Sequence, residues 1–207
     1  MKNIILIVII GLLSAAKLPG ATILFDLRGT AGTGLLIGNE NPAVITGGSG
    51  GEVGAGITYD NVSRILTLNL GWGASNGFTN LTGSTTGGHI HGPTTSGGTA
   101  AFTQNASVLF SLDTLPGWNS SASAGGLTNG TVTLTAAQET ELLAGRYYVN
   151  VHTTTNSGGE IRGYLTAVPE PDRAGLIGLG IILSALRRKR KTPEPEKKGC
   201  QEAHTLV

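Results

Sequence analysis

Three histidines are the residues of this chain best suited to chemistry. His89 and His91 flank Ile90, and His152 lies in a later segment of similar character. Side chains two residues apart on an extended strand point to one face, so His89 and His91 can hold a metal ion together. A third imidazole from another strand would complete a three-histidine site for zinc or copper.

Two polar residues near His152 extend this candidate site. Asn150 shares the strand face of His152, and Glu160 follows a Gly-rich turn. Either can serve as a further ligand or hold a ligand in place. In the competing interpretation the histidines hydrogen bond loops to strand ends, while Glu160 and Arg162 pair with neighbours. We favour that structural role, since no fourth ligand is evident. Convergence of the three rings within about 4 Å of one point would argue against it.

Other kinds of catalytic site find little support. Serine and threonine are plentiful, but no Gly-x-Ser-x-Gly nucleophile elbow occurs. The glycine clusters lack the Lys-Ser/Thr pair that follows a phosphate-binding loop. We therefore expect no enzymatic activity, and no cofactor apart from the zinc or copper of the metal-binding alternative.

Short strands joined by tight turns must position these residues. Gly, Thr, Ser and Asn are abundant and aromatic residues are few, a composition typical of strands and turns. The region 34–56 is predicted to be loop-rich, with Gly47-Gly-Ser-Gly-Gly51 as a breaker. Alternating apolar residues predict strands over 22–28, 64–70, 107–112 and 131–135, and a hairpin of 147–152 with 160–166.

One short helix interrupts the strands. Thr135 and Gln138 have the spacing of a capping box, in which each side chain bonds the backbone of the other residue. Leu142 and Leu143 are predicted to supply the buried side, and Gly145 to end the helix. Several short strands with one helix predict a mainly β protein built as an antiparallel β-sandwich.

The distribution of charge excludes one class of partner. Residues 22–167 carry eight acidic and four basic side chains, a net charge of −4, although the whole chain has a formal charge of +1. This part contains no lysine and no basic patch for nucleic acid. The single cysteine, Cys200, lies in the C-terminal tail, so the domain has to fold without disulfides.

Both ends of the chain have the features of export signals. Lys2, an apolar run and small residues up to Ala21 predict a secretory signal peptide over residues 1–21. Near the other end, the 13 apolar residues Ala174–Leu186 would cover about 20 Å as a helix, against roughly 30 Å of hydrocarbon. They form a marginal membrane span, and the basic residues after them should stay cytoplasmic. That basic cluster consists of Arg187, Arg188, Lys189, Arg190 and Lys191.

The C-terminal order of elements resembles the PEP-CTERM sorting signal of Gram-negative bacteria. The motif residues Val168, Pro169, Glu170 and Pro171 precede the apolar run and the basic cluster. The resemblance implies recognition at the membrane and cleavage by an exosortase, in a host that makes extracellular polysaccharide. Residues 192–207 continue beyond the usual end of such signals, and their polar composition predicts a disordered tail.

The histidine segments resemble the CHRD domain. Its hallmark blocks stand here as His89-Ile-His-Gly-Pro93, Gly145-Arg-Tyr-Tyr-Val-Asn-Val-His-Thr153 and Gly158-Gly-Glu-Ile-Arg-Gly163. The resemblance implies a fold-level identity and no particular reaction. The His-x-His spacing is also similar to that of copper–zinc superoxide dismutase, but that dinuclear site needs more histidines, and its activity is not carried over. We expect an immunoglobulin-like or superoxide-dismutase-like sandwich.

The sequence thus predicts a signal peptide over residues 1–21, a CHRD domain over 22–167, a sorting and membrane segment with a hydrophobic helix over 168–191, and a polar tail over 192–207. The expected function is that of an exported cell-envelope or extracellular-matrix protein with a binding or structural module. The alternative is a metal-binding protein or metalloenzyme that uses His89, His91 and His152. Expected partners are an exosortase, the export machinery, the membrane, and extracellular polysaccharide or matrix proteins.

Overall fold

Residues 65–72 show how this chain makes its strands. Leu66, Leu68 and Leu70 are at most 1% exposed, because every second side chain of a strand faces the core. The computed structural model describes residues 21–169, which form mainly antiparallel strands with one α-helix. The mainly β class and the single short helix predicted from the sequence are confirmed.

The elements follow one another along the chain with short connections. The strands are β1 (Thr22–Gly29), β2 (Gly32–Thr33), β3 (Leu35–Leu36), β4 (Ser49–Asp60), β5 (Ile65–Trp72), β6 (Thr85–His91), β7 (Val108–Ser111), β8 (Trp118–Ser121), β9 (Ala124–Thr133), β10 (Tyr148–Thr153) and β11 (Ile161–Ala167). The helical elements are η1 (Ile37–Asn39), η2 (Ala74–Asn76), η3 (Gly98–Ala101) and α1 (Ala136–Leu143).

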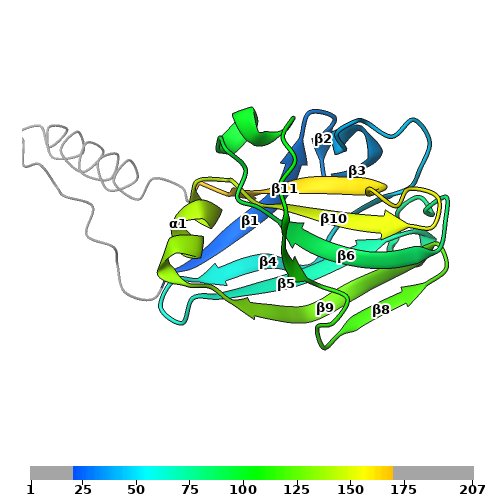
Figure 1. The fold of residues 1–207 in the computed structure, drawn as a ribbon. Helices are drawn as coiled ribbons and strands as arrows, with labels where there is room; N and C mark the ends of the chain where they lie inside the picture. Colours follow the sequence, from blue (N-terminus) through cyan, green and yellow to red (C-terminus); the bar gives the residue numbers. More distant parts are fainter. Residues whose placement is uncertain (1–20, 170–207) are drawn as a thin grey trace, which may run out of the picture. The chain divides into compact units, whose positions relative to one another are not determined.

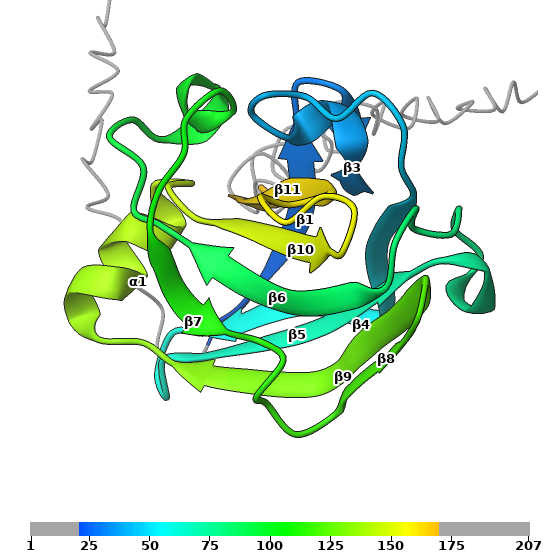
Figure 2. The same ribbon diagram turned by 45° about the vertical axis from the view of Figure 1, so that its right-hand side comes forward.

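One hydrogen-bonded path joins the strands in the order β7-β6-β10-β11-β1-β4-β5-β9-β8, with β2 and β3 attached beside it. In Figures 1 and 2 this path folds over on itself, so that β6, β10 and β11 lie in one layer and β4, β5 and β9 in the other. The arrangement is sandwich-like, although its two layers belong to one continuous sheet.

The main hydrophobic core gathers buried side chains from both layers. Ile90 of β6 and Val149 of β10 come from one layer, and Leu66 and Trp72 of β5 from the other. Trp72 is fully buried and packs against Trp118, with 5.0 Å between the ring centroids. Because the core occupies one side of β6 and β10, their other side is left for polar residues.

The predicted hairpin and helix cap are both present. Strand β10 pairs antiparallel with β11. The Thr135 hydroxyl accepts a hydrogen bond from the backbone N–H of Gln138, and the Gln138 side chain accepts one from the backbone N–H of Thr135, which completes the capping box. Leu142 is fully buried, but Leu143 is 37% exposed, so the prediction that both leucines supply the buried side was wrong. Neighbouring helical residues point about 100° apart, and the short helix packs with one face only.

The predicted glycine breaker was wrong in part. Ser49, Gly50 and Gly51 begin the long strand β4. A Cβ at Gly50 would lie 3.0 Å from the Cβ of Trp72 and would also meet the backbone of β5. Glycine therefore permits a close approach of two strands at this point and does not end one.

Several sequence predictions concern segments outside the described residues. The signal peptide over 1–21, the sorting and membrane segment over 168–191 with its hydrophobic helix, and the tail over 192–207 lie almost wholly there. Among residues 21–169, no helix has the length and apolar character needed to cross a membrane.

Candidate metal centre

The core positions the histidines by occupying the other side of their strands. Ile90 on β6, and Val149 and Val151 on β10, are at most 1% exposed. Because side chains alternate along a strand, the residues between and beside them face away from the core. The two histidine segments therefore present their polar side chains on the outer face of the layer.

Strand register brings the three histidines together on that face. Strands β6 and β10 pair antiparallel, with His89 directly opposite Asn150. His91 lies two residues further along β6, and His152 two residues further along β10. The ring centroids of His89 and His152 are 4.7 Å apart, and that of His91 lies 5.6 Å and 5.8 Å from them.

One ring nitrogen from each histidine approaches a common point. The three candidate ligand atoms lie within 4.8 Å of one another. Atoms no further apart than this lie within about 2.8 Å of a common point, whereas a zinc–histidine bond is roughly 2.0–2.1 Å long. A small inward movement of the rings would bring all three nitrogens into bonding distance of one ion.

Backbone carbonyls determine which ring nitrogen of His91 and of His152 has a free lone pair. Nδ1–H of His91 donates to the carbonyl of Ala106 at 2.9 Å, and Nδ1–H of His152 donates to the carbonyl of Ser157 at 2.9 Å. A carbonyl oxygen only accepts, so Nδ1 carries the proton in each ring and Nε2 presents a lone pair. Metal-bound histidines usually donate their second ring N–H in this way.

Three buried ring nitrogens are then left over. Nε2 of His91, Nε2 of His152 and Nδ1 of His89 have no hydrogen-bond partner within residues 21–169. Each buried polar atom left unpaired costs about 1–3 kcal/mol. If the histidines only hydrogen bonded loops to strand ends, this would explain the two nitrogens that donate to carbonyls. It would not explain these three unpaired nitrogens. Three converging rings, each with an unpaired buried nitrogen, call for a bound species.

Burial keeps two of the rings neutral. Burial, with the charges of the other two histidines and Arg162, lowers the pKa of His91 from 6.5 to about 4. Burial also lowers the pKa of His152, with smaller contributions from His89 and Arg162. Neutral imidazole is the form that binds a metal. These two ligands therefore need not lose a proton near neutral pH.

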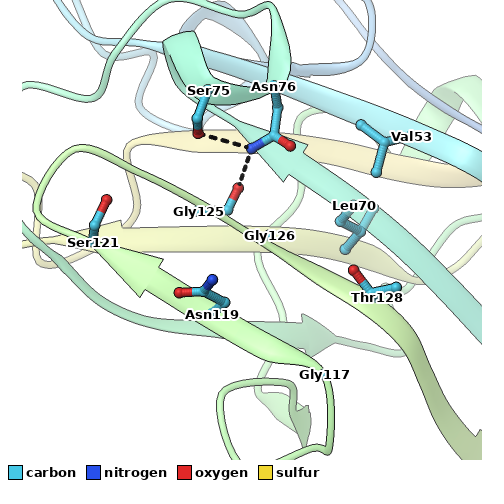
Figure 3. A pocket seen from close by; sticks show the side chains of 10 residues that line it. All are labelled: Val53, Leu70, Ser75, Asn76, Gly117, Asn119, Ser121, Gly125, Gly126 and Thr128. Carbon is cyan, nitrogen blue, oxygen red and sulfur yellow. Dashed lines mark hydrogen bonds between the residues drawn. The ribbon is translucent and has the colours of Figure 1, made fainter.

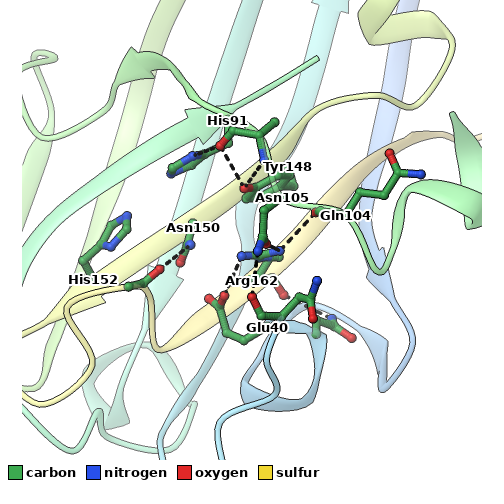
Figure 4. Close-up of polar contacts among 12 residues, drawn as sticks. Glu40, His91, Gln104, Asn105, Tyr148, Asn150, His152 and Arg162 are labelled. Carbon is green, nitrogen blue, oxygen red and sulfur yellow. Dashed lines mark hydrogen bonds and ion pairs between the residues drawn. The ribbon is translucent and has the colours of Figure 1, made fainter. Parts of the chain in front are cut away.

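A stack of buried side chains holds His91 in place. Its ring is 4.9 Å from that of Tyr148 and within 3° of parallel, and the Tyr148 hydroxyl hydrogen bonds the backbone of Ala106. The guanidinium of Arg162 lies 4.2 Å from the centre of the Tyr148 ring. Arg162 also forms a 2.8 Å ion pair with Glu40, and both side chains are 3% exposed (Figure 4). The orientation of His91 is thus set by packing.

The two further candidates from the sequence lie in different surroundings. Asn150 is 1% exposed on the histidine face, and its Nδ2 donates to the carbonyl of Gly158 at 3.3 Å. Glu160 accepts hydrogen bonds from Thr82 and Thr153 and is not a member of the histidine group. Burial would raise the pKa of Glu160, but these hydrogen bonds outweigh it and lower the pKa. Glu160 joins loops, whereas Asn150 belongs to the site.

Sequence reasoning missed Asp113, Tyr148 and Glu40. A Cβ at Gly87 would lie 3.4 Å from Oδ2 of Asp113 and 3.7 Å from Nε2 of His89, so the carboxylate and the ring border one small space. Asp113 and Glu40 carry no local motif, because their neighbours lie far away along the chain. Tyr148 did carry a signal, since it shares the alternating face of the second histidine strand.

A groove lies over β4, β5, β8 and β9, away from the histidines. This groove has a volume of about 350 Å³ and is lined mainly by glycine, serine, asparagine and threonine. Figure 3 shows Asn76 bonded across it to the carbonyl of Gly125, with Asn119 opposite. None of its lining side chains titrates. The groove offers hydrogen bonds, whereas the histidine cluster offers metal chemistry.

Comparison with known proteins bears on the histidine strands. Residues 33–165 match the CHRD domain, a span that contains all three histidines and the strands that carry them. No curated protein and no solved structure gives a significant match.

Proposed function

The chain belongs to the CHRD domain family, and we propose that its CHRD domain binds one copper or zinc ion through His89, His91 and His152. One observation carries this proposal: a ring nitrogen from each of the three histidines lies within 4.8 Å of the other two, and each ring has a buried nitrogen that is not hydrogen bonded within the described residues. The sequence alone favoured a structural role, because spacing could not show that the third ring joins the other two. The convergence reverses that preference.

The ligand set favours copper over zinc. Three neutral imidazoles, without thiolate or carboxylate, suit the later first-row divalent metals. At a given nitrogen site Cu²⁺ binds more tightly than Zn²⁺. In buffered competition, copper should therefore displace zinc from this site.

We propose a binding role for this module outside the cytoplasm. The low pKa of His91, about 4, makes its ring a ligand rather than a proton carrier near neutral pH. The predicted signal peptide and the sorting motif Val168–Pro171 support export. An exosortase at the membrane, and extracellular polysaccharide or matrix proteins outside it, are the partners that belong to this proposal.

Metal titration of the purified full chain tests the proposal. The wild-type protein should bind one equivalent of Cu²⁺ in competition with a chelator of known affinity. His91→Ala and His152→Ala should each weaken binding by more than about 100-fold, since even changes behind a ligand cost 10–100-fold.

The matched control is His204→Ala, because His204 is the one histidine of the chain outside this cluster. That variant should bind Cu²⁺ like the wild type. Binding that falls in the His204 variant and persists in the His152 variant would place the metal in the tail and end the proposal.

A further inference from the structure

Two more buried polar atoms beside the histidines have no partner. They are Oδ1 of Asn150, an acceptor, and Nε of Arg162, a donor, and neither is hydrogen bonded within residues 21–169. Asn150 lies directly opposite His89 on β6 and directly opposite Arg162 on β11. Side chains paired across strands in this way have Cβ atoms about 4.5–5.5 Å apart. Figure 4 shows Asn150 between His152 and Arg162.

Packing fixes the side-chain amide of Asn150 between its neighbours on β6 and β11. Its Nδ2 donates to the carbonyl of Gly158 at 3.3 Å, so Oδ1 is the atom left over. The next residue, Gly159, has φ +126°, and a Cβ at this position would overlap the Asn150 amide. The loop before β11 therefore closes over the amide.

Arg162 is fixed just as firmly by its outer nitrogens. One of them forms the ion pair with Glu40 at 2.8 Å, and the other donates to Oδ1 of Asn105 at 2.9 Å. Nε of Arg162 is the guanidinium nitrogen that is left without a partner within residues 21–169. A single oxygen that donates to Asn150 and accepts from Arg162 would satisfy both leftover atoms.

A metal on the three histidines would supply such an oxygen. Three protein ligands would leave a fourth position open on a bound zinc or copper ion, and water normally fills such a position. The imidazoles are uncharged donors, so a divalent ion would keep its charge and attract an anionic fourth ligand.

We propose that the metal site keeps an exchangeable fourth position, filled by water or hydroxide that donates to Asn150 and accepts from Arg162, where small anions bind by displacing it. This inference rests on the proposed function. Asn150 acts here as a positioning residue that holds the exchangeable ligand through a hydrogen bond.

The test uses the full chain loaded with Cu²⁺. Pulsed EPR in D₂O should show exchangeable deuterons on the copper, and added azide should remove them and produce an azide-to-copper charge-transfer band. Copper binding without exchangeable deuterons, or without that band, would overturn the inference and leave the proposed function standing. If no copper binds, the proposed function itself fails.

Substitution of Asn150 separates positioning from simple structural support. Asn150→Leu removes the acceptor for water, so azide should displace the water more easily, with affinity raised about threefold to tenfold. Asn150→Asp adds a carboxylate beside the metal and should lower azide affinity more than tenfold. Asn119→Leu, the same change at an exposed position of β8, should leave azide affinity unchanged.

Azide affinity that is equal in wild type and in Asn150→Leu would contradict the positioning role. If the Leu variant does not fold, the Asp variant still decides, because unchanged azide affinity in that variant contradicts the inference. Azide binding that occurs only after Asp113→Asn would show that Asp113 closes the fourth position, which overturns the inference.

Discussion

His91 shows at the scale of one residue how burial prepares a candidate metal ligand. Its ring is 9% exposed, lies parallel to Tyr148 and donates through Nδ1 to the carbonyl of Ala106. These contacts fix the tautomer and the direction of Nε2. The same burial lowers the pKa of His91 to about 4, so the ring has a lone pair available over the whole physiological range.

The low pKa of His91 makes the metal-free protein sensitive to mild acid. Between pH 6.5 and about 4 the unfolded state binds a proton at this position that the folded state does not. The free energy of unfolding should therefore be highest above pH 6.5 and fall as the pH drops to about 4, by about 3 kcal/mol at most. Urea denaturation of the metal-free protein over this range measures the effect.

His91→Phe provides the control for this pH dependence, since it keeps an aromatic ring beside Tyr148 but has no titrating group. Its unfolding free energy should fall less between pH 6.5 and 4 than that of the wild type. An equal fall in both proteins would assign the effect to other groups.

At the scale of elements, the β10–β11 hairpin ties together loops that surround the site. Glu160, between the two strands, accepts hydrogen bonds from the amides of Gly48 and Thr82 and from the hydroxyls of Thr82 and Thr153. Three separate segments of the chain thus meet at one carboxylate. The loop that follows β10 also supplies the carbonyl that orients His152.

Glu160→Gln should destabilise the fold strongly. The new amide nitrogen would face hydroxyl and amide donors that need an acceptor, and hydrogen bonds to a charged group contribute about 1.5–3 kcal/mol each. We expect a loss of about 2–4 kcal/mol in the free energy of unfolding, measured by urea denaturation at pH 7.

Glu141→Gln is the matched control, because it makes the same chemical change in the partly exposed ion pair with Arg146. It should cost at most about 1 kcal/mol. Similar losses in the two variants would show that Glu160 does not hold the loops as described.

At the scale of the whole molecule, the chain divides into two units between Val168 and Pro169. The last strand of the described residues, β11, ends at Ala167, and both strands that carry the histidines lie before that point. Processing at the predicted sorting motif would therefore leave the described strands and the histidine cluster intact. The predicted sorting motif and the histidine cluster thus lie in separate parts of the sequence.

The prediction that the protein is exported can be tested by its cellular location and by the two ends of the mature chain. Fractionation of the source cells should find the CHRD domain outside the cytoplasmic membrane, without the predicted signal peptide over residues 1–21. Mass spectrometry of the mature protein determines its first and its last residue. A chain recovered intact from the cytosol would contradict export, and Glu170→Ala, in the sorting motif, should change the C-terminal end but not copper binding.

Strand alternation and family hallmarks were readable from the sequence because they are local. The pattern around Ile90, Val149 and Val151 predicted which side chains share a face, and the spacing of Thr135 and Gln138 predicted the helix cap. Prediction failed at Gly50, which fits a close strand approach, and at Leu143, which the short helix leaves exposed. Both depend on what packs against the residue, and sequence spacing does not contain that information.

The sequence by itself determined the β class, the short helix and the three histidines as candidate ligands, since each follows from residue type and period. Only the tertiary structure decided that the three rings converge and that Glu160 is committed to loops. Cross-strand register and loop packing join residues far apart in the chain, such as Glu40 with Arg162. Burial, which sets the neutral state of His91, also exists only once the layers have closed.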